Sequence, residues 1–441
     1  MRASRATALT RRSPLLTPHA PRRSTVIEEL DYRAPWRRTL YVVWVAGFIA
    51  VSGMSLVTPF LPLYLLDLGV KDVAQAQRWA GLLVSGSFIC AAMVAPVWGS
   101  LADRYGRKPM ALRAIFGLAV SISLMAFATR PEHLLLLRML QGSVGGFVSA
   151  SIALVATAVP RARLGAALGT LQTSLTAGHV VGPLFGGVLA DRMGYNHVFL
   201  ITGGCCVLAG LVVAVFVKED FTPLPAKERH SFRQNLGMLR TVPALRATFM
   251  VMFVTQIGLM VIQPVLALFI RDLAGGSEGL LRTKVGVVFS MPGLAAVVAA
   301  PLWGRRGDRI GHRTTLAMAL LGAGVLYLPQ AWAQTATQLA AMRFFVGLCM
   351  AGVSPSAHSV VASSVASNRT AAALSLLSMA QWSGSVAGPL LGGLISSHLG
   401  ARPIFLITAV LLLCSGTGAL RAARKPVKLL EPAAAEVGED G

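Results

Sequence analysis

Long apolar stretches recur along the chain, and short polar or charged segments separate them. A helix needs about 20 apolar residues to cross a hydrocarbon core of about 30 Å. Twelve stretches meet this requirement, and none carries an Asp or Glu in its interior. We therefore expect an all-α polytopic membrane protein whose twelve transmembrane helices lie approximately at 40–66, 79–101, 110–129, 133–158, 164–190, 196–217, 247–270, 284–304, 314–333, 337–362, 371–397 and 403–421.

The stretches form two similar sets of six. A charged segment at 99–108 lies between the second and third stretches, and a similar segment at 304–313 lies between the eighth and ninth. Their aspartates, Asp103 and Asp308, are 205 residues apart, and further matches follow at this spacing or one residue more. Two repeats with the same orientation predict two pseudo-symmetric six-helix bundles, with a cavity between them near the middle of the membrane.

The repeat divides the chain into five parts. We expect a disordered basic tail at 1–39, an N-terminal bundle at 40–217, a polar linker at 218–246, a C-terminal bundle at 247–421 and a second tail at 422–441. The first tail is rich in Arg, Ser and Thr, so an organellar targeting segment is an alternative interpretation of it.

The formal net charge of +22 would favour nucleic-acid binding in a soluble protein. With 54% hydrophobic and 13% charged residues, however, the chain has too little polar surface for a soluble globule of this size. Lys and Arg are concentrated in the linker and in the loops on one side of the predicted bundle. The positive-inside rule places this side and both termini in the cytoplasm. We expect a protein of the cytoplasmic (inner) membrane, embedded in the lipid bilayer, with no nucleic-acid partner.

Motifs of enzymatic chemistry are missing from the sequence. No phosphate-binding G-x-x-x-x-G-K-[ST] segment occurs, and no His or Cys spacing suits a metal ion. All five cysteines fall inside apolar stretches, where a cysteine behaves as a small hydrophobic residue. We therefore expect neither an enzyme nor a bound cofactor or metal.

Four motifs resemble those of one family. The segment 99–108 matches G-x-L-A-D-R-x-G-R-K, and 138–142 matches R-x-x-Q-G. The segment 178–187 matches G-x-x-x-G-P-x-x-G-G, and 53–62 matches G-x-x-x-x-x-P-x-x-P. With these motifs the chain, from about residue 40 to 421, resembles a transporter of the major facilitator superfamily, in particular its twelve-span drug:proton antiporter branch.

The resemblance implies a gating loop and a packing stripe. The gating residues would be Gly99, Asp103, Arg104, Gly106, Arg107, Lys108 and Asp308. Asp103 would contact the N-terminus of the eleventh helix near Asn368 in one state of the protein. The antiporter motif would be Gly178, Gly182, Pro183, Gly186 and Gly187, where small residues allow close helix packing and the proline permits a bend. Packing without any role in transport is the alternative for this stripe.

Proton coupling is where this sequence departs from the family pattern. Arg138 lies inside the fourth span and stays charged at physiological pH, so it needs a partner unless it reaches the membrane surface. The first span offers no interior carboxylate. We expect Asp67, at the outer end of that span, to be the exchangeable partner of Arg138, although it could equally be a solvated surface residue. His179 is the next candidate for coupling.

The expected function is export of small amphipathic, drug-like compounds by alternating access, in exchange for protons, by a monomer. Candidate substrate contacts are Gln141, Gln263, Phe345 and Trp382, each of which could instead serve helix packing. One rival is an exporter or facilitator of a specific metabolite without proton coupling. That metabolite could be anionic, because Arg138 and Arg343 add positive charge to spans without acids. The other rival is a membrane receptor on the same fold that transports nothing.

Overall fold

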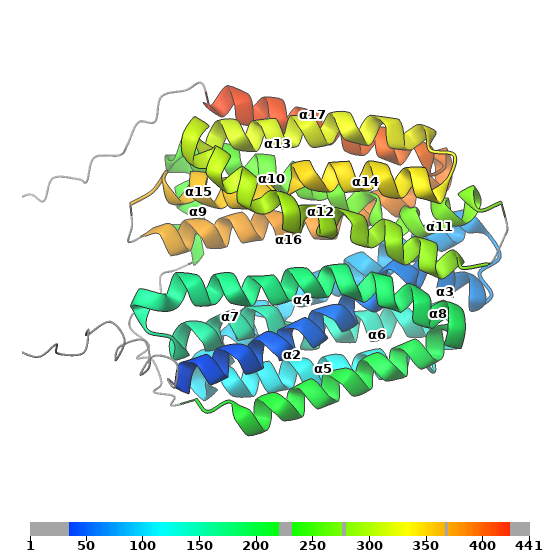
Figure 1. Ribbon diagram of the computed structural model, residues 1–441, viewed down its shortest axis with the longest axis horizontal. Coiled ribbons are helices and arrows are strands. Elements are labelled where there is room, and N and C mark those ends of the chain that lie inside the picture. The colour runs from blue at the N-terminus through cyan, green and yellow to red at the C-terminus, as the bar shows by residue number, and fades with distance from the viewer. Residues whose placement is uncertain (1–34, 220–231, 276–278, 367–368, 424–441) are drawn as a thin grey trace, which may run out of the picture.

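The computed structural model describes residues 35–219, 232–275, 279–366 and 369–423, and in these ranges all regular elements are helices (Figure 1). Nearly all of the two predicted tails lies outside the described residues, as does the central part of the predicted linker. The first helix begins at Pro35, five residues before the predicted boundary of the N-terminal bundle.

The first half of the chain supplies six membrane spans. Its elements are α2 (Pro35–Val57), η1 (Thr58–Phe60), α3 (Leu61–Asp67), α4 (Val73–Tyr105), α5 (Arg107–Met125), α6 (Pro131–Val144), α7 (Phe147–Ala158), η2 (Arg161–Arg163) and α8 (Leu164–Phe216). Helix α8 has 53 residues, which is far more than one crossing needs. It contains two spans because Gly194, with φ 76° and ψ 168°, breaks the helix between them.

The second half repeats this plan after a short helix, α9 (Phe232–Thr241), in the linker region. Its elements are α10 (Pro243–Val261), α11 (Gln263–Leu273), α12 (Leu281–Ile310), α13 (His312–Tyr327), η4 (Leu328–Trp332), α14 (Ala336–Met350), α15 (Val353–Ala362), α16 (Thr370–Leu399) and α17 (Arg402–Ala423). Within the described ranges, ten helical segments have the length and hydropathy of a membrane span. Counting α8 as two spans and adding α16 gives the twelve that the sequence predicts.

Four spans that we expected to be continuous are broken. The first breaks at Thr58–Phe60 and the seventh at Ile262, and each has a proline, Pro59 or Pro264, that removes a backbone donor there. The fourth breaks at Gly145 and Gly146, and the tenth at the matching positions of the repeat. The breaks therefore follow the repeat, and they affect the same two spans in each half.

The repeat also appears in single hydrogen bonds. The indole Nε1 of Trp98 donates to the carbonyl oxygen of Ser143 at 2.7 Å, and Nε1 of Trp303 donates to the carbonyl oxygen of Leu348 at 2.6 Å. The two donors are 205 residues apart in the sequence, and so are the two acceptors. This match agrees with the two pseudo-symmetric bundles that the repeat predicts.

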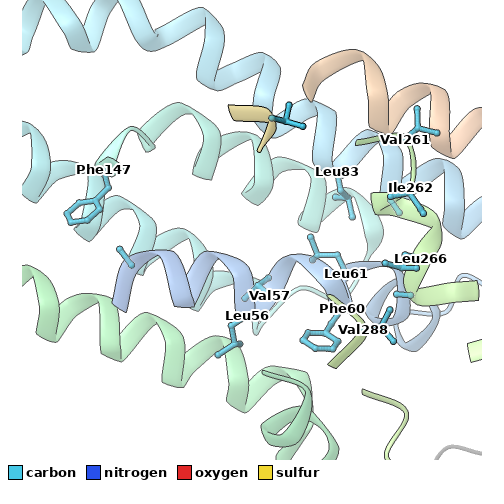
Figure 2. Close-up of a cluster of buried hydrophobic side chains, with 14 of the residues drawn as sticks. Leu56, Val57, Phe60, Leu61, Leu83, Phe147, Val261, Ile262, Leu266 and Val288 are labelled. Carbon is cyan, nitrogen blue, oxygen red and sulfur yellow. The ribbon is translucent and has the colours of Figure 1, made fainter. Parts of the chain in front are cut away.

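The two halves meet at one end of the molecule and diverge toward the other (Figure 1). We call the end that holds Asp103, Asp308 and α9 the linker end, and the opposite end, where α3 and α11 lie, the far end. At the far end, the buried core continues across the boundary between the halves. Phe60 and Leu61 of the first half belong to the same cluster as Leu266 of the second (Figure 2).

Candidate functional site

The predicted gating loop is a direct turn from α4 into α5. Gly106 takes φ 101°, a conformation that side chains rarely adopt, and it joins the two helices without any further residue. Arg107 donates from Nη2 to Oδ1 of Asp103 at 2.7 Å, one helical turn away. Asn368 lies outside the described residues, so the expected contact of Asp103 with the eleventh span stays a prediction. In this conformation the carboxylate pairs within its own half.

Sequence reasoning missed the residue that anchors this loop. The carboxylate of Glu219 accepts from the backbone N–H groups of Arg107 and Lys108, both at 2.7 Å, and so caps the N-terminus of α5. Lys108 also donates from Nζ to the carbonyl oxygen of Ala214 at 2.8 Å. Since Glu219 lies three residues after the end of α8, the loop is tied to the beginning of the linker. In the sequence, the one sign of this anchor was an acidic residue just after the sixth span.

The remaining candidate gating residues also lie at the linker end. Arg104 lies over the ring of Tyr105, 5.3 Å from its centroid, and Gly99 has open space where a side chain would stand. In the second copy, Nε2 of His312 lies 3.6 Å from Oδ1 of Asp308, the same one-turn pairing as in the first copy. The two loops therefore share their geometry, although an arginine pairs with the acid in one and a histidine in the other.

The antiporter motif on α8 packs on two different partners. Gly178, Gly182 and Gly186 lie against the backbone and side chains of α2 and η1, and an added Cβ at any of them would meet neighbouring atoms within 3.0 Å. Gly187 instead lies against the backbone of Arg282, at the beginning of α12 in the other half. The carbonyl of Pro183 likewise contacts Gly286 of α12. One stripe thus builds the first bundle and also forms part of the contact between the bundles.

The opposite interface repeats this arrangement. Gly393 of α16 lies against the backbone of Gln77 in α4, and Gly81 of α4 contacts the carbonyl of Pro389. The hydroxyl of Ser85 donates to the carbonyl oxygen of Val386 at 2.8 Å. On the first interface, the hydroxyl of Ser290 donates to the carbonyl oxygen of Val180 at 2.6 Å. The halves therefore meet through two equivalent helix pairs, α8 with α12 and α4 with α16.

Arg138 is buried, with 6% of its surface exposed, so it does not reach the surface of the bundle. Its Nη1 donates to Oε1 of Gln141 at 2.6 Å, while its Nε has no hydrogen-bond partner among the described residues. The matching Arg343 is buried to the same degree and donates from Nε to the carbonyl oxygen of Val288 at 3.2 Å. Each half thus holds one buried guanidinium.

Asp67 lies near a cation of the second half, Arg282, and not near the predicted partner Arg138 of its own half. Its Oδ2 lies 3.6 Å from Nη2 of Arg282, and the guanidinium of Arg282 also lies over the ring of Tyr195, 4.6 Å from its centroid. Arg138 is paired with Gln141 instead. The sequence could not show this, because the position of a residue along its own helix does not say which helix of the other bundle faces it.

His179 lies next to the first glycine of the stripe. Its Nδ1 is 2.8 Å from the hydroxyl oxygen of Ser55, so the pair joins the fifth span to the first. Which of the two atoms donates depends on the tautomer of the imidazole ring. Sequence reasoning named His179 but not Ser55, because a serine in an apolar helix carries no signal of its own.

The four candidate substrate contacts are spread over the molecule. Gln141 is buried beside Arg138, and Gln263 is the first residue of α11, at the break in the seventh span. Trp382 is 48% exposed and packs edge-to-face on Phe88 of the other half, with ring centroids 5.7 Å apart. Phe345 is 53% exposed. No hydrogen bond or ring contact joins these four to one another in the described part of the chain.

No group of three His, Cys, Asp or Glu side chains within the described ranges is arranged to hold a metal ion. The described residues bring together two buried cations, carboxylates at the two ends of the bundle and closely packed helices.

Comparison with known proteins identifies the family. The sequence profile described as "Major Facilitator Superfamily" matches residues 43–283 and 248–438. The chain belongs to the major facilitator superfamily. It is thus a membrane transporter and not an enzyme, as the sequence analysis expected.

Several bacterial proteins are similar to this chain over most of their length. Multidrug resistance protein MdtG of Serratia proteamaculans (strain 568) is 37% identical over 378 residues, which are 86% of this chain and 92% of that protein. MdtG of Proteus mirabilis (strain HI4320) is 37% identical over 86% of this chain and 94% of that one. With the membrane spans and these bacterial relatives, the chain is a multi-pass protein of the inner membrane that handles a small-molecule substrate.

Solved structures of the superfamily share the fold. A bacterial homolog of the human lysosomal transporter Spinster, in an inward-facing and unoccupied conformation, has a TM-score of 0.70. It is 16% identical to this chain, and the match covers 89% of this chain and 98% of that one. The nucleoside transporter NupG gives a TM-score of 0.72 at 14% identity, over 88% of this chain and all of that one. At these identities the likeness concerns the fold alone.

Proposed function

We propose that this protein exports small amphipathic, drug-like compounds in exchange for protons, as a monomer. The observation that carries the proposal is the 37% identity to proteins named for multidrug resistance, over 86% of the chain. The intact G-x-x-x-G-P-x-x-G-G stripe on α8 supports it, since the family resemblance links this motif to export.

Alternating access is supported by how the halves touch. At the far end the two helix pairs meet at glycines, so their backbones approach closely. Within each half the helices pack on one another, α2 on α8 in the first and α13 on α17 in the second, so the contacts between the halves could separate without unfolding either bundle. The described conformation is closed at the far end. The other state would be closed at the linker end, where Asp103 would reach the eleventh span.

We place the linker end and both termini in the cytoplasm, because Lys and Arg are concentrated in the loops of that end. The described conformation would then be open to the cytoplasm, ready to take up a compound from inside the cell. The far end, with Asp67 and Arg282, would face the outside.

For proton coupling we keep Asp67, His179 and Arg138 as the candidates. The carboxylate of Asp67 lies 3.6 Å from Nη2 of Arg282, and this contact has to break when the far end opens. The carboxylate is already half-exposed at the far end, so opening would take its cation away rather than uncover it, and this loss would favour uptake of an external proton as a compound leaves. His179 and Arg138 lie deeper in the bundle, where they would carry the coupling toward the other end.

The decisive experiment is transport by purified protein in liposomes. Ethidium, as an amphipathic cation, would be tested with and without an imposed pH gradient. We expect gradient-driven accumulation and a matching movement of protons. Dye flux that the pH gradient does not affect would exclude proton coupling. The absence of flux for every compound would favour a receptor.

A second function is favoured by one observation. Arg138 and Arg343 are both buried, and each keeps one guanidinium nitrogen without a hydrogen-bond partner among the described residues. A pair of buried cations suits a specific anionic metabolite that moves without protons. In the same liposomes, this function would show as uptake of small organic anions and no transport of ethidium.

A further inference from the structure

Helix α12 begins without a cap of its own. Leu280 precedes its first residue and takes φ 56°, and its apolar side chain makes no hydrogen bond to the helix. The first turn contains no acidic residue. The first N–H groups of a helix have no partner inside the helix, so they must be satisfied from elsewhere.

The partner comes from the other half of the molecule. The carboxylate of Asp191, on α8, accepts from the backbone N–H of Arg282 at 3.1 Å and from that of Thr283 at 2.8 Å. It also accepts from the hydroxyl of Thr283 at 2.6 Å. These are the second and third residues of α12, the positions that an ordinary capping side chain serves. Only 10% of the Asp191 side chain is exposed.

The side chain of Arg282 strengthens the same junction. Its guanidinium lies 4.0 Å from Asp191, 3.6 Å from Asp67 and over the ring of Tyr195. All three partners belong to the first half, whereas Arg282 and the helix N-terminus belong to the second. The positive end of the α12 dipole and one cation thus face two carboxylates across the boundary.

The equivalent interface shows that close packing does not require this acid. There, Ser397 occupies the position of Asp191, and its hydroxyl oxygen accepts from Nε of Arg78 at 3.0 Å. Helix α4 carries its own cap, Asp72, which accepts from Ala74 N–H at 3.1 Å and from Gln75 N–H at 3.2 Å. The glycine and proline contacts are nonetheless the same on both sides. The carboxylate at 191 therefore adds a charge interaction that the repeat alone does not explain.

We propose that Asp191 is a helix cap supplied across the two halves, which stabilises the conformation closed at the far end. The interaction exists only while α8 and α12 touch, so it favours that state over the one open at the far end. Asp191 is then a positioning residue of the transport cycle, and this role rests on the alternating-access mechanism proposed above.

The test measures the balance of states directly. Spin labels would be attached at Lys71→Cys in the first half and Leu399→Cys in the second, both exposed at the far end. The full-length protein would be used in lipid nanodiscs, with its native cysteines replaced, and distances would be measured by pulsed electron spin resonance. Asp191→Asn removes the charge and keeps the shape. We expect the ratio of far-end-closed to far-end-open molecules to fall about tenfold, because Asn can still accept a hydrogen bond but no longer carries the charge that faces the helix end and Arg282.

The matched control is Asp72→Asn, which removes the charge of a helix cap at the same end but within one half. It should leave the distance distribution as in the parent protein. If Asp191→Asn does not fold, Thr283→Val removes one of the hydrogen bonds to Asp191 and should shift the ratio in the same direction. An unchanged distribution in the folded variant, or an equal shift in the Asp72 control, would overturn the proposal. Because no substrate is needed, failure to transport drugs would not affect this result.

Discussion

Replacing Gly187 by alanine should open the far end, because there is no space for a methyl group between α8 and α12. An ideal Cβ at Gly187 would lie 2.9 Å from both the carbonyl carbon of Arg282 and the Cα of Thr283, and nearer still to the carbonyl oxygen of Arg282. Ordinary contacts begin at 3.4 Å, so the helices would have to separate by at least 0.5 Å. The opposing atoms are backbone atoms of a helix and cannot turn aside.

The size of the expected change in the closed-to-open ratio follows from the contacts that such a separation would disturb. Overpacking by one methyl group typically costs about 1–3 kcal/mol. Moving α12 away would also stretch the hydrogen bonds of Asp191 to its first turn. The strain exists only while the helices touch, so it disfavours the far-end-closed state. We expect the closed-to-open ratio to fall roughly 5- to 150-fold.

Two alanine substitutions on the same helix serve as controls. Gly182→Ala would place Cβ 2.5 Å from the carbonyl oxygen of Ser52, inside the first half. It should lower the melting temperature without changing the ratio of states. At Gly169 nothing lies within 4 Å, so Gly169→Ala should change neither.

The assay is the spin-label distance measurement at the far end, combined with initial rates of ethidium export from liposomes. We expect Gly187→Ala to move the distribution toward longer distances and to slow export, because the cytoplasm-open state becomes scarce. A wild-type distance distribution in Gly187→Ala would refute the reasoning, since it would show that the helices tolerate the methyl group in contact.

Three further predictions concern topology, gating and coupling. A cysteine introduced at Ser231 should not react with a membrane-impermeant reagent added from outside to intact cells, and labelling there would reverse the proposed orientation. The Asp103→Asn variant should insert normally but lose most transport, since a contact worth on the order of 1 kcal/mol disappears from one state. The effect of Asp308→Asn should be milder. A normal flux of the Asp103 variant in liposomes would exclude a gating role for Asp103. The Asp67→Asn variant should lose flux driven by a pH gradient yet keep downhill exchange, whereas Arg138→Ala should damage both activities. If the Asp67 variant still concentrates substrate at the wild-type rate, Asp67 is not the coupling residue and His179 becomes the next candidate.

The spans and their repeat were predictable from the sequence because their causes are local. The bilayer sets the length of each apolar helix, and the twelve expected spans are present in the structure. The repeat could be recognised because matching residues keep their spacing, as Trp98 and Trp303 show by making the same hydrogen bond. The proline at each break of the first and seventh spans was visible as well, although its consequence for the helix was not.

Only the tertiary structure decided which side chains meet across helices. The sequence predicted Asp67 as the partner of Arg138, whereas Asp67 faces Arg282 and Arg138 contacts Gln141. The caps at Glu219 and Asp191 lie more than 90 residues from the N–H groups that they serve. Such pairs depend on how two bundles are rotated against each other and on which end is closed. Hydrophobic periodicity orients each helix toward the core, but it does not specify the facing helix or the state of the molecule.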